Sequence, residues 1–118
     1  MSGVSLRLLV IKTHKVESVR VFYETIGLRF ENEQHGNGPE HYSSSLDDGI
    51  FEIYPLLTNQ DVDSNLRLGF AVADVDSVIR SLDLSSERLV QSPKETPWGF
   101  QAIVCDPDGR KVELYRAA

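Results

Sequence analysis

Two glutamates that recur at matching places in the chain are the clearest candidates for chemistry. Glu52 follows the dipeptide Asp48-Gly49, and Glu113 follows the dipeptide Asp108-Gly109, so each lies on a short apolar segment just after a turn. Carboxylates placed in this way can hold a cation, pair with an arginine or transfer a proton. Which of these they do depends on the side chains that the fold brings beside them.

The segments around the two glutamates belong to an internal repeat. The first half contains Leu6-Arg7-Leu8-Leu9-Val10-Ile11 followed by Val16-Glu17-Ser18-Val19. The second half contains Leu66-Arg67-Leu68-Gly69-Phe70-Ala71-Val72 followed by Val75-Asp76-Ser77-Val78. Such self-similarity indicates two copies of one supersecondary unit. It predicts two curved half-sheets that face each other around a cleft, each with a glutamate on its last strand.

Hydrophobic periodicity and turn residues predict the element order βαβββ in both halves. We expect an α+β fold in a single domain of residues 1–118, with repeat one at about 5–57, a linker at about 58–65 and repeat two at about 66–116. The first half should hold a strand at 6–13, a helix at 15–26, a strand at 28–34 and a hairpin within 41–57. The second should hold a strand at 66–73, a helix at 74–82, a weak strand at 88–91, a loop at 92–97, and a hairpin of 99–105 and 110–116.

The strand period of two then predicts which side chains share a face. A two-residue turn at Asp48-Gly49 would pair Ser45 with Glu52. It would place five residues on one face: His41, Ser43, Ser45, Glu52 and Tyr54. Arg67 should face the cleft from its strand, as should Leu8, Val10 and Lys12 from theirs. A four-residue loop in the last hairpin would put Glu113 and Tyr115 on one face with Ala102 and Phe100.

Composition narrows the classes of partner. The chain has 118 residues, a net charge of −6 and a hydrophobic fraction of 41%. An acidic chain of this kind does not suit nucleic acid or an anionic membrane surface, and it contains no apolar run of membrane-spanning length. Cys105 is the single cysteine, which favours a reducing, cytoplasmic location.

Several motifs together resemble the vicinal oxygen chelate superfamily, which includes glyoxalase I, extradiol dioxygenases and bleomycin-resistance proteins. They are Phe22-Tyr23 late in the first helix, Gly27-Leu28 after it, and Asp106-Pro107-Asp108-Gly109 before Val112-Glu113-Leu114. The resemblance covers nearly the whole chain and implies the fold of paired βαβββ units. It also implies a homodimer and, in the metalloenzymes of the group, one divalent metal held by residues from four strands.

Only two of those four metal positions carry a ligand in this chain. The resemblance places the metal ligands at Glu52, Glu113, Arg67 and Leu8. Leucine has no donor atom, and arginine is always cationic with no lone pair to offer. We therefore expect no metal cofactor, with Arg67 instead forming ion pairs with Glu52, Glu113 or both. The alternative is one divalent metal near Glu52 and Glu113 that recruits His41.

Three functions follow from these residues. The first is a metal-free protein of the bleomycin-resistance kind that sequesters a small organic or toxic compound. The second is an enzyme, a glyoxalase-like lyase or isomerase or a dioxygenase, with an aberrant metal site. The third is a structural or regulatory module whose cleft is filled by its own side chains. In the simplest structural role, Glu52 and Glu113 only pair with Arg67 and hold the two half-sheets together.

The candidate ligand-binding residues are His41, Glu52, Tyr54, Arg67, Trp98, Phe100 and Glu113. Trp98 lies in a loop and would wall the cleft, while Tyr54 and Phe100 could equally belong to the core. His14 and His35 are expected to be loop residues with no role. The carboxylates and aromatic residues favour a neutral or cationic aromatic ligand.

Overall fold

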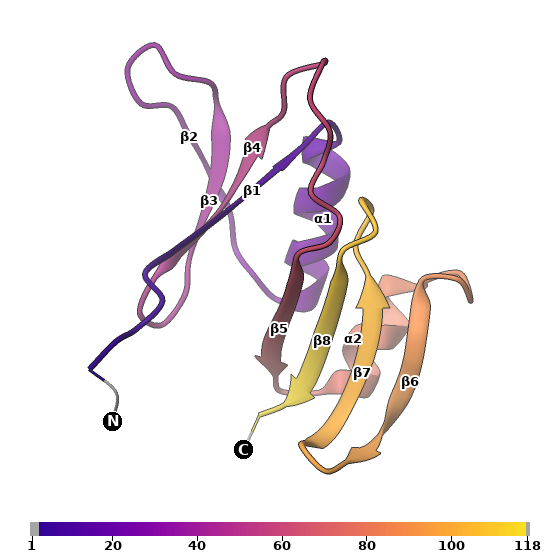
Figure 1. The fold of residues 1–118 in the computed structure, drawn as a ribbon. Helices are drawn as coiled ribbons and strands as arrows, with labels where there is room; N and C mark the ends of the chain where they lie inside the picture. The colour runs from indigo at the N-terminus through magenta and orange to yellow at the C-terminus, as the bar shows by residue number, and fades with distance from the viewer. Residues whose placement is uncertain (1–2, 118) are drawn as a thin grey trace.

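The computed structural model describes residues 3–117 and contains two helices and eight strands (Figure 1). The first repeat comprises β1 (Leu8–Thr13), α1 (Val16–Ile26), β2 (Glu31–Glu33), β3 (His41–Ser45) and β4 (Ile50–Pro55). The second comprises β5 (Arg67–Val72), α2 (Val75–Leu82), β6 (Leu89–Thr96), β7 (Gly99–Cys105) and β8 (Lys111–Arg116). The predicted βαβββ order and the α+β class are confirmed.

Each repeat forms one four-stranded sheet with the same topology. The strand orders are β1-β4-β3-β2 and β5-β8-β7-β6, and the first and last strands of each repeat run parallel. The last strand of each repeat, which carries the glutamate, therefore lies inside its sheet between two partners. We call these the first and the second half-sheet.

The sixth strand is longer than the sequence indicated. The loop expected at 92–97 is mostly strand, because β6 continues to Thr96 along β7. Pro93 is tolerated there because β6 is an edge strand, and the pairing with β7 is irregular between Leu89 and Lys94.

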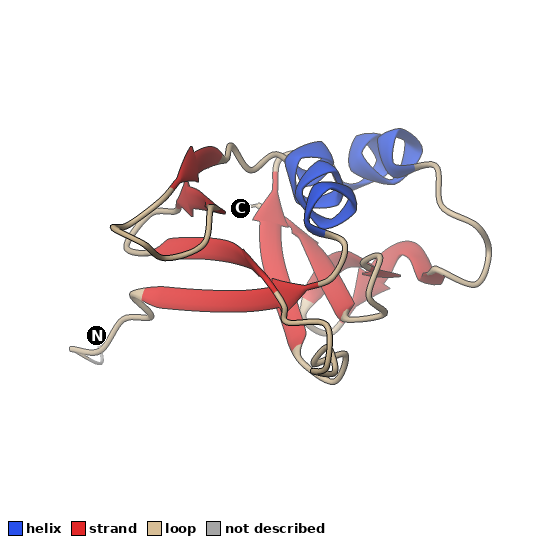
Figure 2. Ribbon diagram, turned by 90° about the horizontal axis from the view of Figure 1, so that it is seen from above, coloured by secondary structure: helices blue, strands red, loops and turns tan. Residues whose placement is uncertain are grey.

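The two helices lie on the same side of the strands (Figure 2). The face of α1 that packs inward consists of Val19, Phe22, Tyr23 and Ile26, all buried. Residues of both repeats form one core, with Tyr23 in ring contact with both Phe51 and Phe70. The opposite faces of the half-sheets are left for a site.

A buried charged network also joins the two repeats. Arg110, 1% exposed, donates to the Asp106 carboxylate at 3.1 Å and to the backbone carbonyl of Lys12 at 2.9 Å. The Tyr23 hydroxyl donates to the same carboxylate at 2.8 Å. Burial and then the Asp106 charge raise the pKa of Tyr23 well above its usual range, so it stays a donor. The Asp106-Pro107-Asp108-Gly109 motif thus fastens the last hairpin to the first repeat.

The first hairpin has a longer turn than expected, with no change of face. Ser45 pairs with Ile50 and Ser43 with Glu52, and the Leu46 N–H donates to the Gly49 carbonyl at 2.8 Å. This register differs from the expected one by two residues, so each side chain keeps its side of the sheet. Gly49 is required here because a Cβ would lie 2.7 Å from the backbone oxygen of Arg7.

The last hairpin differs from the expectation by one residue, and this moves Phe100. Cys105 pairs with Lys111, which leaves a five-residue loop, and Glu113 and Tyr115 pair with Ile103 and Gln101. Gln101 and Ile103 therefore share the face of Glu113, whereas Phe100 and Ala102 lie on the helix side. The expectation that Phe100 shares the glutamate's face was wrong.

Candidate functional site

The first half-sheet brings three predicted site residues together. Glu52 occupies the middle of β4, and His41 begins β3 beside it. The His41 ring stacks on the Tyr54 ring with 4.0 Å between centroids and 8° between planes. The side chain of His41 is only 1% exposed, so it is a sheltered group rather than a solvated strand end. Partial burial and the nearby Glu52 and Glu33 carboxylates raise the pKa of Tyr54.

Two further residues, which the sequence reasoning missed, complete this cluster. His41 Nε2 lies 3.5 Å from a carboxylate oxygen of Glu33 and 3.5 Å from one of Glu52. His35 Nε2 lies 3.6 Å from Glu33, and the His35 and His41 rings are 5.1 Å apart. His35, which was expected to be a loop residue with no role, therefore lies beside both Glu33 and His41. The usable signal was Glu33-Gln34-His35, because residues two apart on an extended chain point the same way.

The second half-sheet surrounds its glutamate differently. The Arg67 guanidinium donates to Glu113 at 2.5 Å, and the Tyr115 hydroxyl donates to the other carboxylate oxygen. These two hydrogen bonds, first that of Tyr115 and then that of Arg67, hold the pKa of Glu113 below its usual range. Glu113 therefore remains a charged carboxylate, and its negative charge is balanced by that of Arg67. Within residues 3–117 Arg67 forms no ion pair with Glu52, so of the two expected partners it meets only Glu113.

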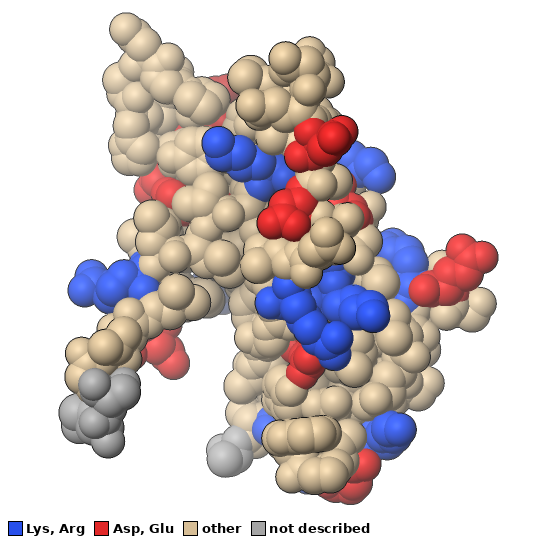
Figure 3. Space-filling model, viewed as in Figure 1, with Lys and Arg blue, Asp and Glu red and all other residues tan. Residues whose placement is uncertain are grey.

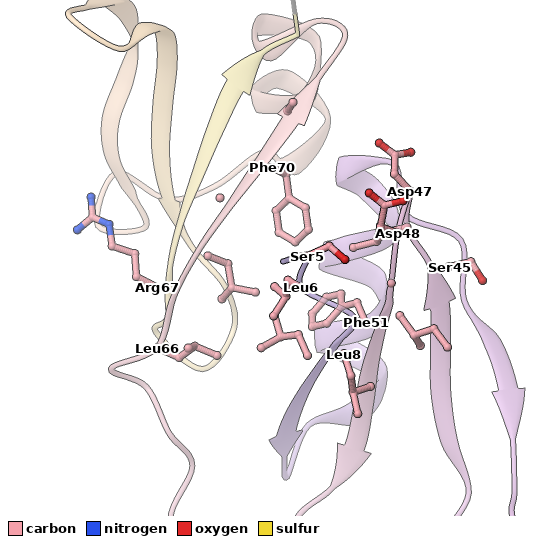
Figure 4. A pocket seen from close by; sticks show the side chains of 17 residues that line it. Ser5, Leu6, Leu8, Ser45, Asp47, Asp48, Phe51, Leu66, Arg67 and Phe70 are labelled. Carbon is pink, nitrogen blue, oxygen red and sulfur yellow. The ribbon is translucent and has the colours of Figure 1, made fainter. Parts of the chain in front are cut away.

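A groove runs between the two half-sheets. It has a volume of 970 Å³ and lies between the start of β1, the β3–β4 turn and β5. Leu6, Leu8 and Phe51 face it from one side, and Leu66 and Phe70 from the other (Figure 4). The molecule is visibly hollowed between its two halves (Figure 3).

The groove has few polar groups, and they are near its ends. The polar residues along it include Asp47 and Asp48 of the β3–β4 turn, Ser45 at the end of β3 and Ser5 before β1. Arg67 borders the groove, but its guanidinium extends away from the apolar side chains (Figure 4). The arrangement is that of a ligand site, mostly apolar with a small number of polar contacts.

The two predicted aromatic walls do not lie in this groove. Trp98 occupies the turn between β6 and β7 and is 77% exposed. The Phe100 ring lies under the Arg116 guanidinium, 4.9 Å from its centre. The aromatic residues that do line the groove are Phe51 and Phe70, with ring centroids 6.1 Å apart. Phe70 lies on the helix-facing side of β5, in ring contact with Tyr23 of α1, and it reaches the groove at the opening between the two half-sheets.

The family's four-strand metal position does not fit a metal in this chain. Leu8 offers no donor atom, and the equivalent residue of the second repeat, Arg67, is a cation already bound to Glu113. A divalent ion there would have to displace the arginine from its carboxylate. No step that depends on such a metal can be built from these residues.

Comparison with known proteins agrees with this architecture. No family model matches the chain. A protein of Mycolicibacterium smegmatis (strain ATCC 700084 / mc(2)155), described as uncharacterized, is 24% identical over 98% of this chain and 96% of its own. No helix within the described part of the chain is long and apolar enough to cross a membrane.

Two solved structures from Streptomyces sp. CB03234 superpose over almost the full length. One is TnmS3, an antibiotic binding protein, with a TM-score of 0.73 and 24% identity, covering 100% of this chain and 99% of its own. The other is a glyoxalase/bleomycin resistance protein with a TM-score of 0.69 and 26% identity, covering 95% and 100%. The repeated βαβββ units, the glutamate on each last strand and these neighbours identify the fold as that of the glyoxalase/bleomycin-resistance group of the vicinal oxygen chelate superfamily.

Proposed function

We propose that this protein binds a small organic molecule in the groove between its half-sheets and acts by sequestering or carrying it. The observation that carries the proposal is the groove itself: its 970 Å³ lies within the range of roughly 300–1,000 Å³ typical of small-molecule sites. Its apolar walls suit a hydrophobic ligand. The antibiotic-binding neighbour with the same fold supports a binding role.

The charges around the groove favour a neutral or cationic aromatic ligand. Asp47 and Asp48 are the acidic groups at its rim, and Arg67, which also lines it, is paired with Glu113. The whole chain carries a net charge of −6, which slows the approach of anions. Phe70 offers an aromatic contact at the base of the groove, and the fully buried Phe51 lies behind it. An anionic ligand would have to compete with Glu113 for Arg67.

We further propose that the binding does not use a metal at the family's position and that the protein is not a lyase or isomerase of the glyoxalase type. Chemistry of that type needs a Lewis acid that polarises adjacent oxygens of the substrate. Leu8 and Arg67 occupy two of the four places that would hold it. Glu113, a third, is engaged by Arg67 and Tyr115. The remaining groups can position a ligand, which fits a binding protein.

Filling the groove tests the proposal. Gly69 lines it, and a Cβ added there would meet the Tyr115 ring edge at 3.5 Å and Glu113 at 3.9 Å, which are ordinary contacts. Gly69→Leu should therefore fold and lose binding, while Ser92→Leu, on the exposed side of β6, should keep it. The measurement is calorimetric titration with a cationic acridine, a neutral flavone and an anionic naphthalenesulfonate. Saturable binding of either of the first two, lost in Gly69→Leu, supports the proposal; binding of none, or of the anion alone, contradicts it.

We also propose that the protein is a cytoplasmic homodimer. The cleft-side residues Leu8 and Val10 are 54% and 37% exposed in the single chain, and Leu6 is 75% exposed. A second copy facing these strands would cover Val10 and close over the groove at Leu6 and Leu8, so that the ligand would lie between the groove and the second chain. Light scattering at micromolar concentration should give twice the 13.3 kDa of one chain. A mass of 13.3 kDa under those conditions refutes the dimer.

A further inference from the structure

Four side chains with metal-binding atoms meet at one end of the first half-sheet. Glu33 ends β2, His35 follows it, His41 begins β3 and Glu52 lies in β4. One donor atom of each lies within 4.8 Å of the others. We propose that these four residues, the His41 cluster, bind a divalent transition-metal ion. Two imidazoles with two carboxylates suit Zn²⁺ best.

The surroundings of His41 show why a cation is needed. Nδ1 lies 3.2 Å from the Pro39 carbonyl oxygen, an acceptor, so Nδ1 carries the hydrogen. In a neutral ring this leaves a lone pair on Nε2. Among residues 3–117 that atom is buried without a hydrogen-bond partner, and it faces two carboxylate oxygens at 3.5 Å. Three electron-rich atoms around one point repel one another unless a positive charge sits between them.

The spacing of the donors fits a metal better than a proton. A proton on Nε2 would draw a carboxylate to a charge-assisted distance of about 2.7–2.9 Å. A tetrahedral Zn²⁺ with bonds of about 2.0–2.1 Å holds its ligands roughly 3.3 Å apart. Three of the six separations among the four donor atoms, at 3.5, 3.5 and 3.6 Å, are close to the second arrangement, and all six are within 4.8 Å.

The protein also supplies the groups that orient metal ligands elsewhere. The contact from Nδ1 to the Pro39 carbonyl fixes the tautomer and directs Nε2 toward the cluster. The Tyr54 ring stacked on His41 shields one side from water. Within residues 3–117, no lysine or arginine forms an ion pair with Glu33 or Glu52, so no side-chain cation already neutralises them.

This site differs from the family's four-strand position. All of its ligands belong to one half-sheet and its β2–β3 loop, and Glu113 is not among them. With four protein ligands the coordination is complete, which is typical of a structural zinc site. The ion would fasten the loop of residues 34–40, which contains Gly36, Gly38 and Pro39, onto the sheet. The expectation that the chain binds no metal rested on the family's position, where Leu8 and Arg67 stand.

Calorimetric titration of the tag-free protein with ZnCl₂ tests the site. The wild-type protein should bind one Zn²⁺ per chain, and Co²⁺ should give the strong visible absorption of a tetrahedral ion. His35→Ala and Glu33→Gln alter partly exposed side chains, so both variants should fold. Each should weaken binding by roughly 100-fold or more, since even outer-shell changes cost 10–100-fold. His41→Gln should abolish it.

Two matched variants serve as controls. His14→Ala removes an exposed histidine that contacts the Gln60 carbonyl far from the cluster, and it should leave binding unchanged. Glu113→Gln should also leave it unchanged, whereas a family-type site would lose its metal. The proposal is overturned if Zn²⁺ gives no stoichiometric binding, if His35→Ala and Glu33→Gln bind as well as the wild type, or if Glu113→Gln abolishes binding.

Discussion

Glu52 and Glu113 occupy equivalent places in the two half-sheets, yet their surroundings are opposite in charge. In the second half-sheet Arg67 is hydrogen-bonded to Glu113, and Lys94 pairs with Gln101 on the neighbouring strands. In the first half-sheet Leu8 stands in the place of Arg67, Glu33 in that of Lys94 and His41 in that of Gln101. The second repeat carries cationic side chains near its glutamate. The first repeat brings together carboxylates and imidazoles, which can bind a cation from outside the chain.

The comparison shows how a duplicated unit can diverge without changing its backbone. Both sheets keep the same strand order, and both keep a tyrosine two residues after the glutamate. Tyr115 donates to Glu113, whereas Tyr54 stacks on His41. Residues on the cleft side are free to change because the helix-facing side maintains the core. The function of each half-sheet is therefore set by a few exchanged side chains.

The largest effect is expected where the two repeats are joined. Arg110→Ala leaves the Asp106 carboxylate buried without its cation, and it should lower the free energy of unfolding by about 3–5 kcal/mol. Arg67→Ala removes a half-exposed cation and should cost only about 0.2–1 kcal/mol. Urea unfolding of both variants measures the difference. Equal losses would mean that the cleft-side arginine holds the repeats together as much as the buried one does.

A smaller effect is the difference between Glu113 and Glu52 in their coupling to Arg67. Double-mutant cycles should couple Arg67 to Glu113 by roughly 0.2–1 kcal/mol, as measured for exposed ion pairs, and should show no coupling between Arg67 and Glu52. The variants are Arg67→Ala combined with Glu113→Gln or with Glu52→Gln, each followed by urea unfolding. Comparable coupling to both glutamates would contradict the division of roles and would favour a single cleft shared by all three residues.

Whether the predicted faces of the hairpin strands were right depended on how far the predicted register was displaced. In the hairpin of β3 and β4 the expected pairing was displaced by two residues, so His41, Glu52 and Tyr54 still share a face. In the hairpin of β7 and β8 a displacement of one residue moved Phe100 to the helix side. The strand order could be predicted because apolar periodicity is a local property of each segment. The length of the last loop could not, because it depends on contacts such as the hydrogen bond from the Arg110 N–H to the Asp106 carboxylate.

The His41 cluster could not be assembled from the sequence for a related reason. Glu33 lies on an edge strand of three residues, and His35 lies in the loop that follows it. Neither segment has enough hydrophobic pattern to fix its pairing. Only the register of Glu33 opposite His41 brings these residues to Glu52. The groove likewise arises from how the half-sheets sit against each other, which no strand pattern encodes.

The smallest effect is the pH dependence that Glu113 contributes in the second half-sheet. The pKa of Glu113 is held below its ordinary 4.5, so its ion pair stabilises the fold above that pH and is lost as the pH falls through the lowered value. Between about pH 5 and pH 3 the melting temperature of the wild type should therefore fall more steeply than that of Glu113→Gln. Parallel melting curves over this interval would show that Glu113 gains nothing from Arg67 and Tyr115.

The division between the two half-sheets is tested most directly by locating a metal ion in a crystal. Crystals soaked in ZnCl₂ would be measured at the zinc absorption edge, where an anomalous difference map shows each bound ion. We expect one peak per chain, between His41, His35, Glu33 and Glu52, and none beside Glu113. A peak coordinated by Glu113, or no peak at the His41 cluster, would contradict the account.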